Sequence, residues 1–379
     1  MMVAANRTLR LLATCAVVAS ALILGACGSS RPKPVELGAV VPLLPVHLAW
    51  QTHIGSVDRL VLAPAVHGDT VVLASESGTV AALDARSGAS LWRAQLADTL
   101  SAGVGSDGQR AAVISRGREL IVMQAGRELW RKPLPAQTFT APLVAGGRVF
   151  VMTADRSVMA FDGGSGASLW NQQRQGETLV LRENGLLMAV GDTLVAGISG
   201  RMVGFDPDSG MVRWEAPLAT PRGANDVERL VEVVGGVSRE GNVVCARAFQ
   251  AAVGCVDAAR GALLWTRPAH GARGIDGDAQ ALYGTESNGL VQAWKRADGS
   301  PLWTWQQLRY RHLTAPLLLG RSVVIGDSTG LVHLLSKEDG SPLNRLTTDS
   351  SGVATAPVVA GKTLVVVTRQ GSVYGFRPD

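Results

Sequence analysis

The sequence is poor in the residues and motifs that most enzymes use. It has four cysteines and six histidines among 379 residues. No two cysteines are adjacent or spaced as Cys-x-x-Cys, and no Gly-x-Ser-x-Gly or Walker motif occurs. Only His47 and His53 lie close together, and no carboxylate or thiol stands at ligand spacing beside them. These gaps exclude the common hydrolase, nucleotidase and zinc patterns, and they predict a protein with no metal, no cofactor and no catalytic residues.

Charge of one sign is also lacking. The chain has 36 basic and 31 acidic residues, a formal net charge of +5. Arg7 and Arg10 lie in a segment that we expect to be removed, which leaves 34 basic residues and a net charge of about +3. No run of Lys or Arg stands out, so we predict no nucleic-acid partner. The hydrophobic content of 46% is ample for a folded core.

The N-terminus has the layout of a bacterial secretory signal. Arg7 and Arg10 precede the apolar run Leu11–Leu24, which is too short for a comfortable membrane span. The run ends in Leu-Gly-Ala before Cys27, which resembles the lipobox of bacterial lipoproteins. In that family the cysteine becomes the acylated N-terminus of the mature protein. The resemblance predicts a signal peptide over residues 1–26; the alternative is an ordinary signal peptide that ends near a cysteine.

The residues after Cys27 suggest how the mature chain is held. Gly28 stands where an Asp would favour the inner membrane, so the resemblance implies export to the outer membrane, facing the periplasm. Residues 27–45 are rich in proline and predict a lipidated, flexible tether. We expect the folded domain to span residues 46–379.

A repeated unit decides the architecture. A glycine is followed four residues later by tryptophan in six places: Gly88/Trp92, Gly126/Trp130, Gly166/Trp170, Gly210/Trp214, Gly261/Trp265 and Gly299/Trp303. A seventh copy, Gly340/Asn344, lacks the tryptophan, and several copies carry an aspartate four residues before the glycine. Short β-branched runs precede each copy, so each unit predicts four antiparallel strands. We interpret the Asp-x-x-x-Gly stretch as the turn between strands three and four, and the tryptophan as packing between neighbouring sheets.

The period predicts an all-β, eight-bladed β-propeller. The marker positions are Trp50, the six tryptophans above and Asn344, and their spacing of roughly forty residues is typical of four-stranded blades. Trp50 has no strands before it, whereas residues 356–376 supply strands without a closing one. The strand His47–Gln51 should therefore complete the last blade and close the ring, which removes exposed edges. The wide interval between Trp214 and Trp265 predicts an insertion around Thr220–Val227.

The cysteines of the mature chain, apart from Cys27, are Cys245 and Cys255. They flank a turn near Phe249–Ala251, which would set them opposite each other on paired strands. The oxidising periplasm favours a disulfide between them. The alternative is two buried free cysteines that act as small apolar residues.

The repeat resembles the PQQ-like, tryptophan-docking repeat. With a lipobox in front and eight predicted blades, the chain is similar to the BamB family, lipoproteins of the outer-membrane β-barrel assembly (Bam) complex. The resemblance covers roughly residues 27–379. Two stretches sharpen it: Leu313–Gly330, which contains Thr314-Ala315-Pro316, and Asp349–Val358.

The resemblance implies a partner and a contact surface. Members of that family bind a periplasmic POTRA domain of BamA through loops at one end of the propeller. The family's Leu-x-Leu-Arg loop matches Leu179, Leu181 and Arg182, and if this segment were a strand both leucines would share one face. A second, acidic loop corresponds to Glu232, whereas Val234 stands where a second acid is expected.

The predicted function is that of a non-catalytic scaffold of the Bam complex. It would bind BamA and other subunits and aid folding and insertion of outer-membrane proteins, with unfolded clients as a further partner. One alternative is a PQQ-dependent periplasmic dehydrogenase, which shares the repeat but typically adds an adjacent cysteine pair or a cluster of calcium-binding acids. Another is a lipoprotein propeller that binds a different envelope partner.

Overall fold

The computed structural model describes residues 32–174, 179–221, 224–225 and 229–379. Residues 35–379 form one compact unit, separate from residues 1–34. Every regular element in the described residues is a β-strand. This part of the chain contains no helix long and apolar enough to cross a membrane. The signal peptide predicted for residues 1–26 and the lipidation site predicted at Cys27 lie outside the described residues.

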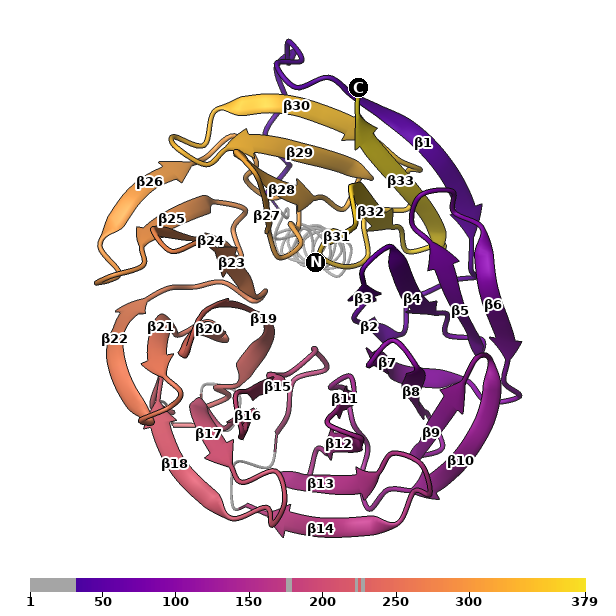
Figure 1. Ribbon diagram of the computed structural model, residues 1–379. Coiled ribbons are helices and arrows are strands. Elements are labelled where there is room, and N and C mark those ends of the chain that lie inside the picture. The colour runs from indigo at the N-terminus through magenta and orange to yellow at the C-terminus, as the bar shows by residue number, and fades with distance from the viewer. Residues whose placement is uncertain (1–31, 175–178, 222–223, 226–228) are drawn as a thin grey trace, which may run out of the picture. The chain divides into compact units, whose positions relative to one another are not determined.

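The strands form eight sheets arranged as blades around a central axis (Figure 1), which confirms the predicted eight-bladed propeller. The four strands of each blade run in order from the axis outward. Blade 1 contains β3 (Ala65–His67), β4 (Thr70–Ala74), β5 (Thr79–Asp84) and β6 (Ser90–Gln95). Blade 2 contains β7 (Leu100–Ser106), β8 (Arg110–Ser115), β9 (Glu119–Gln124) and β10 (Arg127–Pro133). Blade 3 contains β11 (Leu143–Ala145), β12 (Arg148–Met152), β13 (Ser157–Asp162) and β14 (Ser168–Gln173). Blade 4 contains β15 (Leu187–Val190), β16 (Thr193–Ile198), β17 (Arg201–Phe205) and β18 (Val212–Pro217).

The second half of the ring repeats this plan. Blade 5 contains β19 (Val233–Glu240), β20 (Val243–Ala248), β21 (Ala252–Asp257) and β22 (Ala262–Pro268). Blade 6 contains β23 (Ile275–Gly277), β24 (Ala281–Thr285), β25 (Val291–Lys295) and β26 (Pro301–Trp305). Blade 7 contains β27 (Leu317–Leu319), β28 (Ser322–Gly326), β29 (Leu331–Ser336) and β30 (Pro342–Thr347). Blade 8 contains β31 (Val358–Ala360), β32 (Thr363–Val367), β33 (Ser372–Pro378) and β1 (Val46–His53).

The two ends of the chain close the ring, as the sequence predicted. β1 pairs antiparallel with β33, from Val46 opposite Pro378 to His53 opposite Ser372. The middle strands of each blade are almost wholly buried because a neighbouring blade covers each of their faces, whereas the outer strands are largely exposed. This arrangement explains the continuous apolar runs of the middle strands.

Blade 2 has one strand more than the repeat predicted. The two-residue strand β2 (Val61–Leu62) pairs in parallel with β7. Ala63 extends this pairing, because its amide donates to the Gly103 carbonyl at 2.7 Å. The chain therefore satisfies backbone groups near the axis before it enters blade 1.

Each tryptophan at a marker position packs on the repeat glycine of the following blade, which shows why the two recur together. Gly166 has φ +70°, and a Cβ added there would lie 2.6 Å from the Trp130 ring. The Trp130 indole donates to the Gly163 carbonyl at 3.1 Å. The same hydrogen bond joins Trp50 to Ala85, Trp170 to Pro207, Trp265 to Arg296 and Trp303 to Lys337. The repeat glycine thus provides both a left-handed turn and room for an indole ring.

The segment before β1 differs from the prediction of a tether that runs free to residue 45. Residues 35–45 belong to the propeller unit and hydrogen-bond to blade 7, where the Leu43 amide donates to the Leu343 carbonyl at 2.8 Å. Leu37 and Leu44 pack against its buried apolar residues. The insertion predicted around Thr220–Val227 falls in the connection between β18 and β19, part of which lies outside the described residues.

Candidate functional site

The connection between β14 and β15 carries three of the residues singled out by the sequence. These are Leu179, Leu181 and Arg182, and none of them lies in a strand. The two leucines therefore do not share one face of a strand, as they would if the segment were extended and paired. Leu179 is exposed (38%) and Leu181 is half-buried. The chain here crosses from an outer strand to the inner strand of the next blade, so no neighbouring strand pairs with it. Other side chains must therefore hold the loop.

Arg156 joins this loop to the second candidate loop. It lies in the turn between β12 and β13, with φ +68°. Its side chain is buried (8% exposed) and forms an ion pair with Glu232, which precedes β19. The same guanidinium donates to the Leu179 carbonyl at 3.0 Å. One buried cation therefore brings together Leu179 and Glu232, which are far apart in the sequence.

The acid of the second loop is largely withdrawn from solvent. Burial raises the pKa of the Glu232 carboxyl, and the charge of Arg156 opposes that shift. Val234, at the position where the family pattern led us to expect a second acid, is buried in β19 (3% exposed). This loop is therefore not acidic: the charge of Glu232 is neutralised by Arg156, and the neighbouring Val234 is apolar.

Arg182 and Glu183 are held by residues on either side of their loop. The Arg182 guanidinium donates to the carbonyl oxygen of Arg59, in the connection that precedes β2. Glu183 forms an ion pair with Arg273, from the connection between β22 and β23. Burial raises the pKa of the Glu183 carboxyl, and Arg273 opposes the shift. The two loop residues do not pair with each other but brace the loop against distant blades.

A hollow opens beside the ion pair. Phe139, Met152, Val180 and Leu181 line it, together with Arg156 and Glu232. An apolar hollow with one buried ion pair is suited to receive a protruding side chain of a partner, because desolvated anchors contribute most of the binding energy at protein interfaces. Sequence reasoning missed Arg156; its position in a blade turn gave no signal that it meets two loops.

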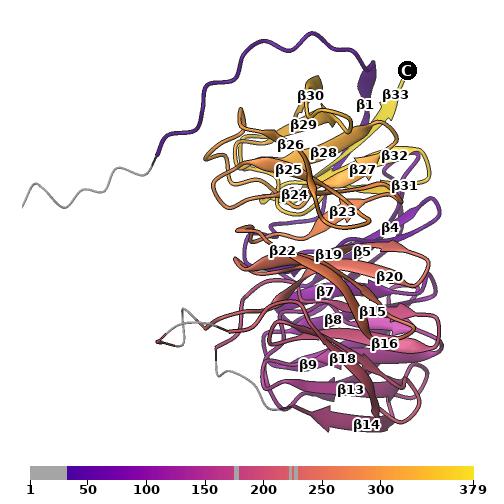
Figure 2. The ribbon, with the colours of Figure 1, turned by 90° about the vertical axis from the view of Figure 1, so that its left-hand side faces the viewer.

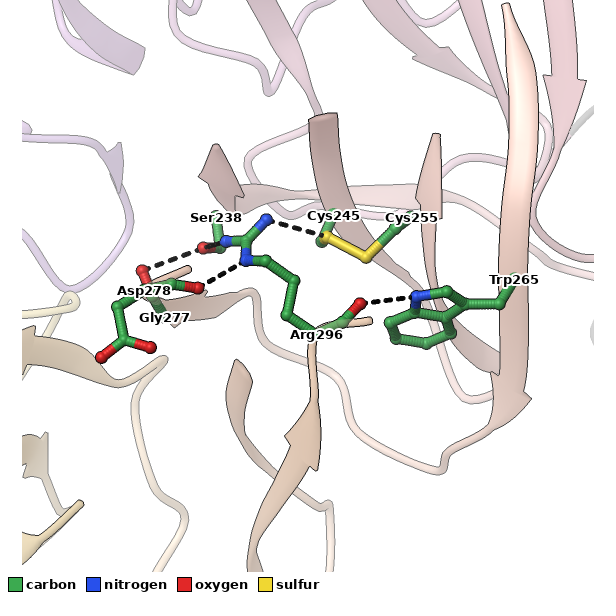
Figure 3. The surroundings of a disulfide bond; sticks show 7 residues. All are labelled: Ser238, Cys245, Cys255, Trp265, Gly277, Asp278 and Arg296. Atoms are coloured by element: carbon green, nitrogen blue, oxygen red, sulfur yellow. Dashed lines mark hydrogen bonds between the residues drawn. A yellow bond between two sulfur atoms is a disulfide. The ribbon is translucent and has the colours of Figure 1, made fainter. Parts of the chain in front are cut away.

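The cysteine pair lies inside blade 5, in the core. Cys245 of β20 and Cys255 of β21 face each other in the register and form a disulfide, with both residues fully buried (Figure 3). Arg296 donates to the Cys245 sulfur at 3.2 Å and to the Asp278 carbonyl at 2.5 Å, and its own carbonyl accepts from Trp265. The disulfide therefore belongs to the contact between blades 5 and 6.

The described residues contain no group of three or more His, Cys, Asp or Glu side chains that could hold a metal ion. The groups at the candidate site are apolar side chains, hydrogen-bonding groups and the Arg156–Glu232 ion pair. Groups of this kind can bind a partner protein. The fold defines the class: an eight-bladed propeller of tryptophan-docking repeats, with a candidate binding surface on the side of its outer-to-inner connections.

Comparison with known proteins places this propeller in a family. The family model for the outer membrane protein assembly factor BamB matches residues 76–305. BamB of Burkholderia pseudomallei is 37% identical over 379 residues, covering 98% of this chain and 100% of that protein. BamB of Bordetella pertussis is 34% identical and covers 78% of each chain. The chain belongs to the BamB family.

Solved structures show the same fold. The crystal structure of BamB from Moraxella catarrhalis matches with a TM-score of 0.80 at 23% identity, covering 88% of this chain and 99% of that one. Quinohemoprotein alcohol dehydrogenase from Comamonas testosteroni matches with a TM-score of 0.68 at 13% identity, covering 88% and 76%. At such identities both matches speak for the fold alone.

Proposed function

We propose that this protein is a non-catalytic scaffold lipoprotein of the outer-membrane β-barrel assembly machinery. In this role it binds a POTRA domain of BamA and, with the other Bam subunits, aids the folding and insertion of outer-membrane proteins. Membership of the BamB family supports the general role. The loops that carry Leu179, Leu181, Arg182 and Glu232 are the proposed contact.

The observation that carries the proposal is the junction at Arg156. Its guanidinium holds Leu179 and Glu232 together at one side of the ring. Two loops fixed in this way form one prepared surface, and a surface ordered before binding loses less conformational entropy when the partner arrives. Without the contacts of Arg156, the two loops would be held only by their own blades and would not be fixed relative to each other.

Acylation at Cys27 is the second part of the proposal. The acyl chains would hold the protein on the periplasmic face of the outer membrane, since each buried CH₂ group contributes about 0.8 kcal/mol. Confinement to this surface raises the effective concentration of the propeller near BamA. Unfolded client proteins are a further proposed partner, because the exposed outer strands can accept an extended segment by strand addition.

The direct test is binding of the purified BamA periplasmic region to the variants Leu181→Ala and Arg182→Ala by calorimetry. We expect a loss of affinity of tenfold or more, about 1.4 kcal/mol, when either anchor is removed. The matched control is Leu91→Ala with Arg93→Ala, an exposed pair on the outer strand β6 of blade 1, which should bind as the unaltered protein does.

Unchanged affinity in both loop variants would refute the proposed contact surface. Absence of any binding by the unaltered protein would refute BamA as the partner, and affinity capture from solubilised envelopes would then identify a different one. Mass spectrometry of the protein from membranes tests the acylation of Cys27 separately.

A further inference from the structure

Residues 35–44, called the strap below, lie along blade 7 and are held at both ends. At the start of the strap, the Val35 amide donates to the Arg309 carbonyl at 3.2 Å, and Arg311 donates to the Val35 carbonyl at 2.8 Å. Further along, arginine and asparagine side chains hold the strap carbonyls: Arg345 binds Gly38 at 3.1 Å, Arg321 binds Leu43 at 3.1 Å and Asn344 binds Leu44 at 2.7 Å. The strap is therefore a docked element rather than free chain.

The other blades show what the strap covers. In each outer strand the register of pairing skips the residue before the marker position, as at a β-bulge. In five blades this residue is an exposed leucine: Leu91 56%, Leu129 42%, Leu169 46%, Leu264 51% and Leu302 51%. In blade 7 the corresponding Leu343 is only 8% exposed, packed beside Leu44. The same repeat position is thus buried only where the strap lies.

The lost tryptophan of blade 7 fits this arrangement. In other blades an indole donates to a carbonyl in the turn before the next blade's outer strand, as Trp303 does to Lys337. Blade 8 has no such turn, because its outer strand comes from the N-terminal part of the chain. Asn344 instead donates to Leu44, just before β1. The asparagine of blade 7 therefore binds the strap where the other blades use a tryptophan to bind the next blade.

The strap carries the chain from one side of the ring to the other. β1 begins at Val46, on the side of the turns between third and fourth strands. Val35 contacts Arg309 and Arg311, in the connection between β26 and β27. That connection lies on the same side as the loops of Leu179 and Glu232, because all outer-to-inner connections leave the blades at the same end. Figure 2 shows the chain before β1 passing over to the side on which the β18–β19 connection projects.

We propose that the strap delivers the anchored end of the chain to the side of the propeller that carries the partner-binding loops, so that this side is turned toward the lipid surface. The proposal rests on the proposed acylation of Cys27. Cys27 precedes Val35 by eight residues, a reach of at most about 28 Å, whereas a tether free to Val46 would reach about 65 Å from the opposite side. The docked strap shortens the reach and reverses the side from which the chain leaves.

The docking itself is tested by hydrogen–deuterium exchange of the strap amides. Val35 and Leu43 donate hydrogen bonds in the docked state, so the peptide that spans them should exchange several-fold more slowly than a free chain of the same sequence. Exchange at the free rate would overturn the proposal. A variant with residues 35–43 replaced by Gly and Ser should lose the protection, and its thermal midpoint shows whether the ring remains folded.

The orientation is tested with the acylated protein in vesicles of phosphatidylethanolamine and phosphatidylglycerol. A dye is attached at Lys362→Cys or at Gln370→Cys, two exposed positions at opposite ends of β32 in blade 8. Energy transfer to an acceptor on the lipid headgroups should be several-fold larger from position 370, on the side of the connections, than from position 362.

The Gly/Ser strap variant should abolish this difference, and a matched replacement of residues 29–34 should retain it. Equal transfer from both positions in the unaltered protein, or a difference that survives replacement of the strap, would overturn the proposed orientation. If the protein proves to carry no acyl chains, the proposed orientation is refuted together with the anchor. The exchange measurement then still tests whether the strap is docked. Loss of BamA binding alone would affect only the proposed function.

Discussion

At the scale of single residues, Arg156 determines whether the two candidate loops act as one surface. Its charge compensates the buried carboxylate of Glu232, and its second nitrogen holds Leu179. Breaking a buried ion pair by removing one partner costs about 3–5 kcal/mol, because the other charge stays buried without compensation. Arg156→Ala should therefore lower both stability and affinity for the partner.

The two effects of Arg156 can be separated. In the double variant Arg156→Met with Glu232→Gln no charge remains uncompensated, so most of the stability should return, as measured by urea unfolding. The loop carbonyl of Leu179 still lacks its donor, so affinity for the BamA periplasmic region should remain low. Full recovery of affinity in the double variant would contradict a positioning role for Arg156.

A second buried cluster, around Asp327, predicts that the stability depends on pH. The Asp327 carboxylate accepts hydrogen bonds from Arg311 at 3.3 Å and Thr329 at 2.7 Å and lies 3.0 Å from the His333 Nε2 atom. Burial lowers the pKa of His333, whereas the hydrogen bonds that Asp327 receives hold the pKa of its carboxyl well below its usual range despite burial.

Because the folded protein resists protonation of His333, the unfolded chain binds more protons just below pH 6.5. The free energy of unfolding should therefore fall as the pH drops through 6.5 toward the lower pKa of the folded state, by at most about 1.4 kcal/mol per pH unit from this group. His333→Gln should flatten this slope in urea titrations between pH 5 and 8. Equal slopes in both proteins would refute the assignment.

At the scale of elements, the stability of the ring depends on indole rings seated on glycines. Gly166 and Gly146 both have positive φ, but only Gly166 faces a tryptophan; around Gly146 nothing lies within 4 Å of an added Cβ. An alanine at either position carries backbone strain of about 1–2 kcal/mol. Gly166→Ala should cost roughly 1–3 kcal/mol more because it displaces Trp130. Equal losses for Gly166→Ala and Gly146→Ala in thermal unfolding would contradict this.

These elements also show what the sequence could reveal. The Gly/Trp repeat predicted the blades because its spacing reflects local turns and contact with the adjacent blade, both of which recur. Arg156 could not be found in this way, since residues 156, 179 and 232 meet only when blades 3, 4 and 5 pack side by side. The strap was missed for a related reason: Leu37 and Leu44 in a proline-rich stretch look like a linker until their receiving surface, formed by the other end of the chain, is known.

At the scale of the whole molecule, β1 is the element on which closure depends. It supplies the outer strand of blade 8, and Trp50 joins this strand to blade 1 through its hydrogen bond to Ala85 at 2.7 Å. A chain that begins at residue 54 would leave the edge of β33 unpaired and expose the apolar surface between blades 8 and 1. Unpaired strand edges recruit other chains, so we expect self-association and a lower unfolding midpoint.

The comparison that isolates β1 is with a chain that begins at residue 45. That chain lacks the strap but keeps the closing strand, so light scattering should find it monomeric, with only a modest loss of midpoint from the exposed Leu343. If the chain that begins at residue 54 were equally monomeric and equally stable, the ring would hold by blade packing alone. The pairing of β1 with β33 would then serve mainly to connect the strap to the propeller.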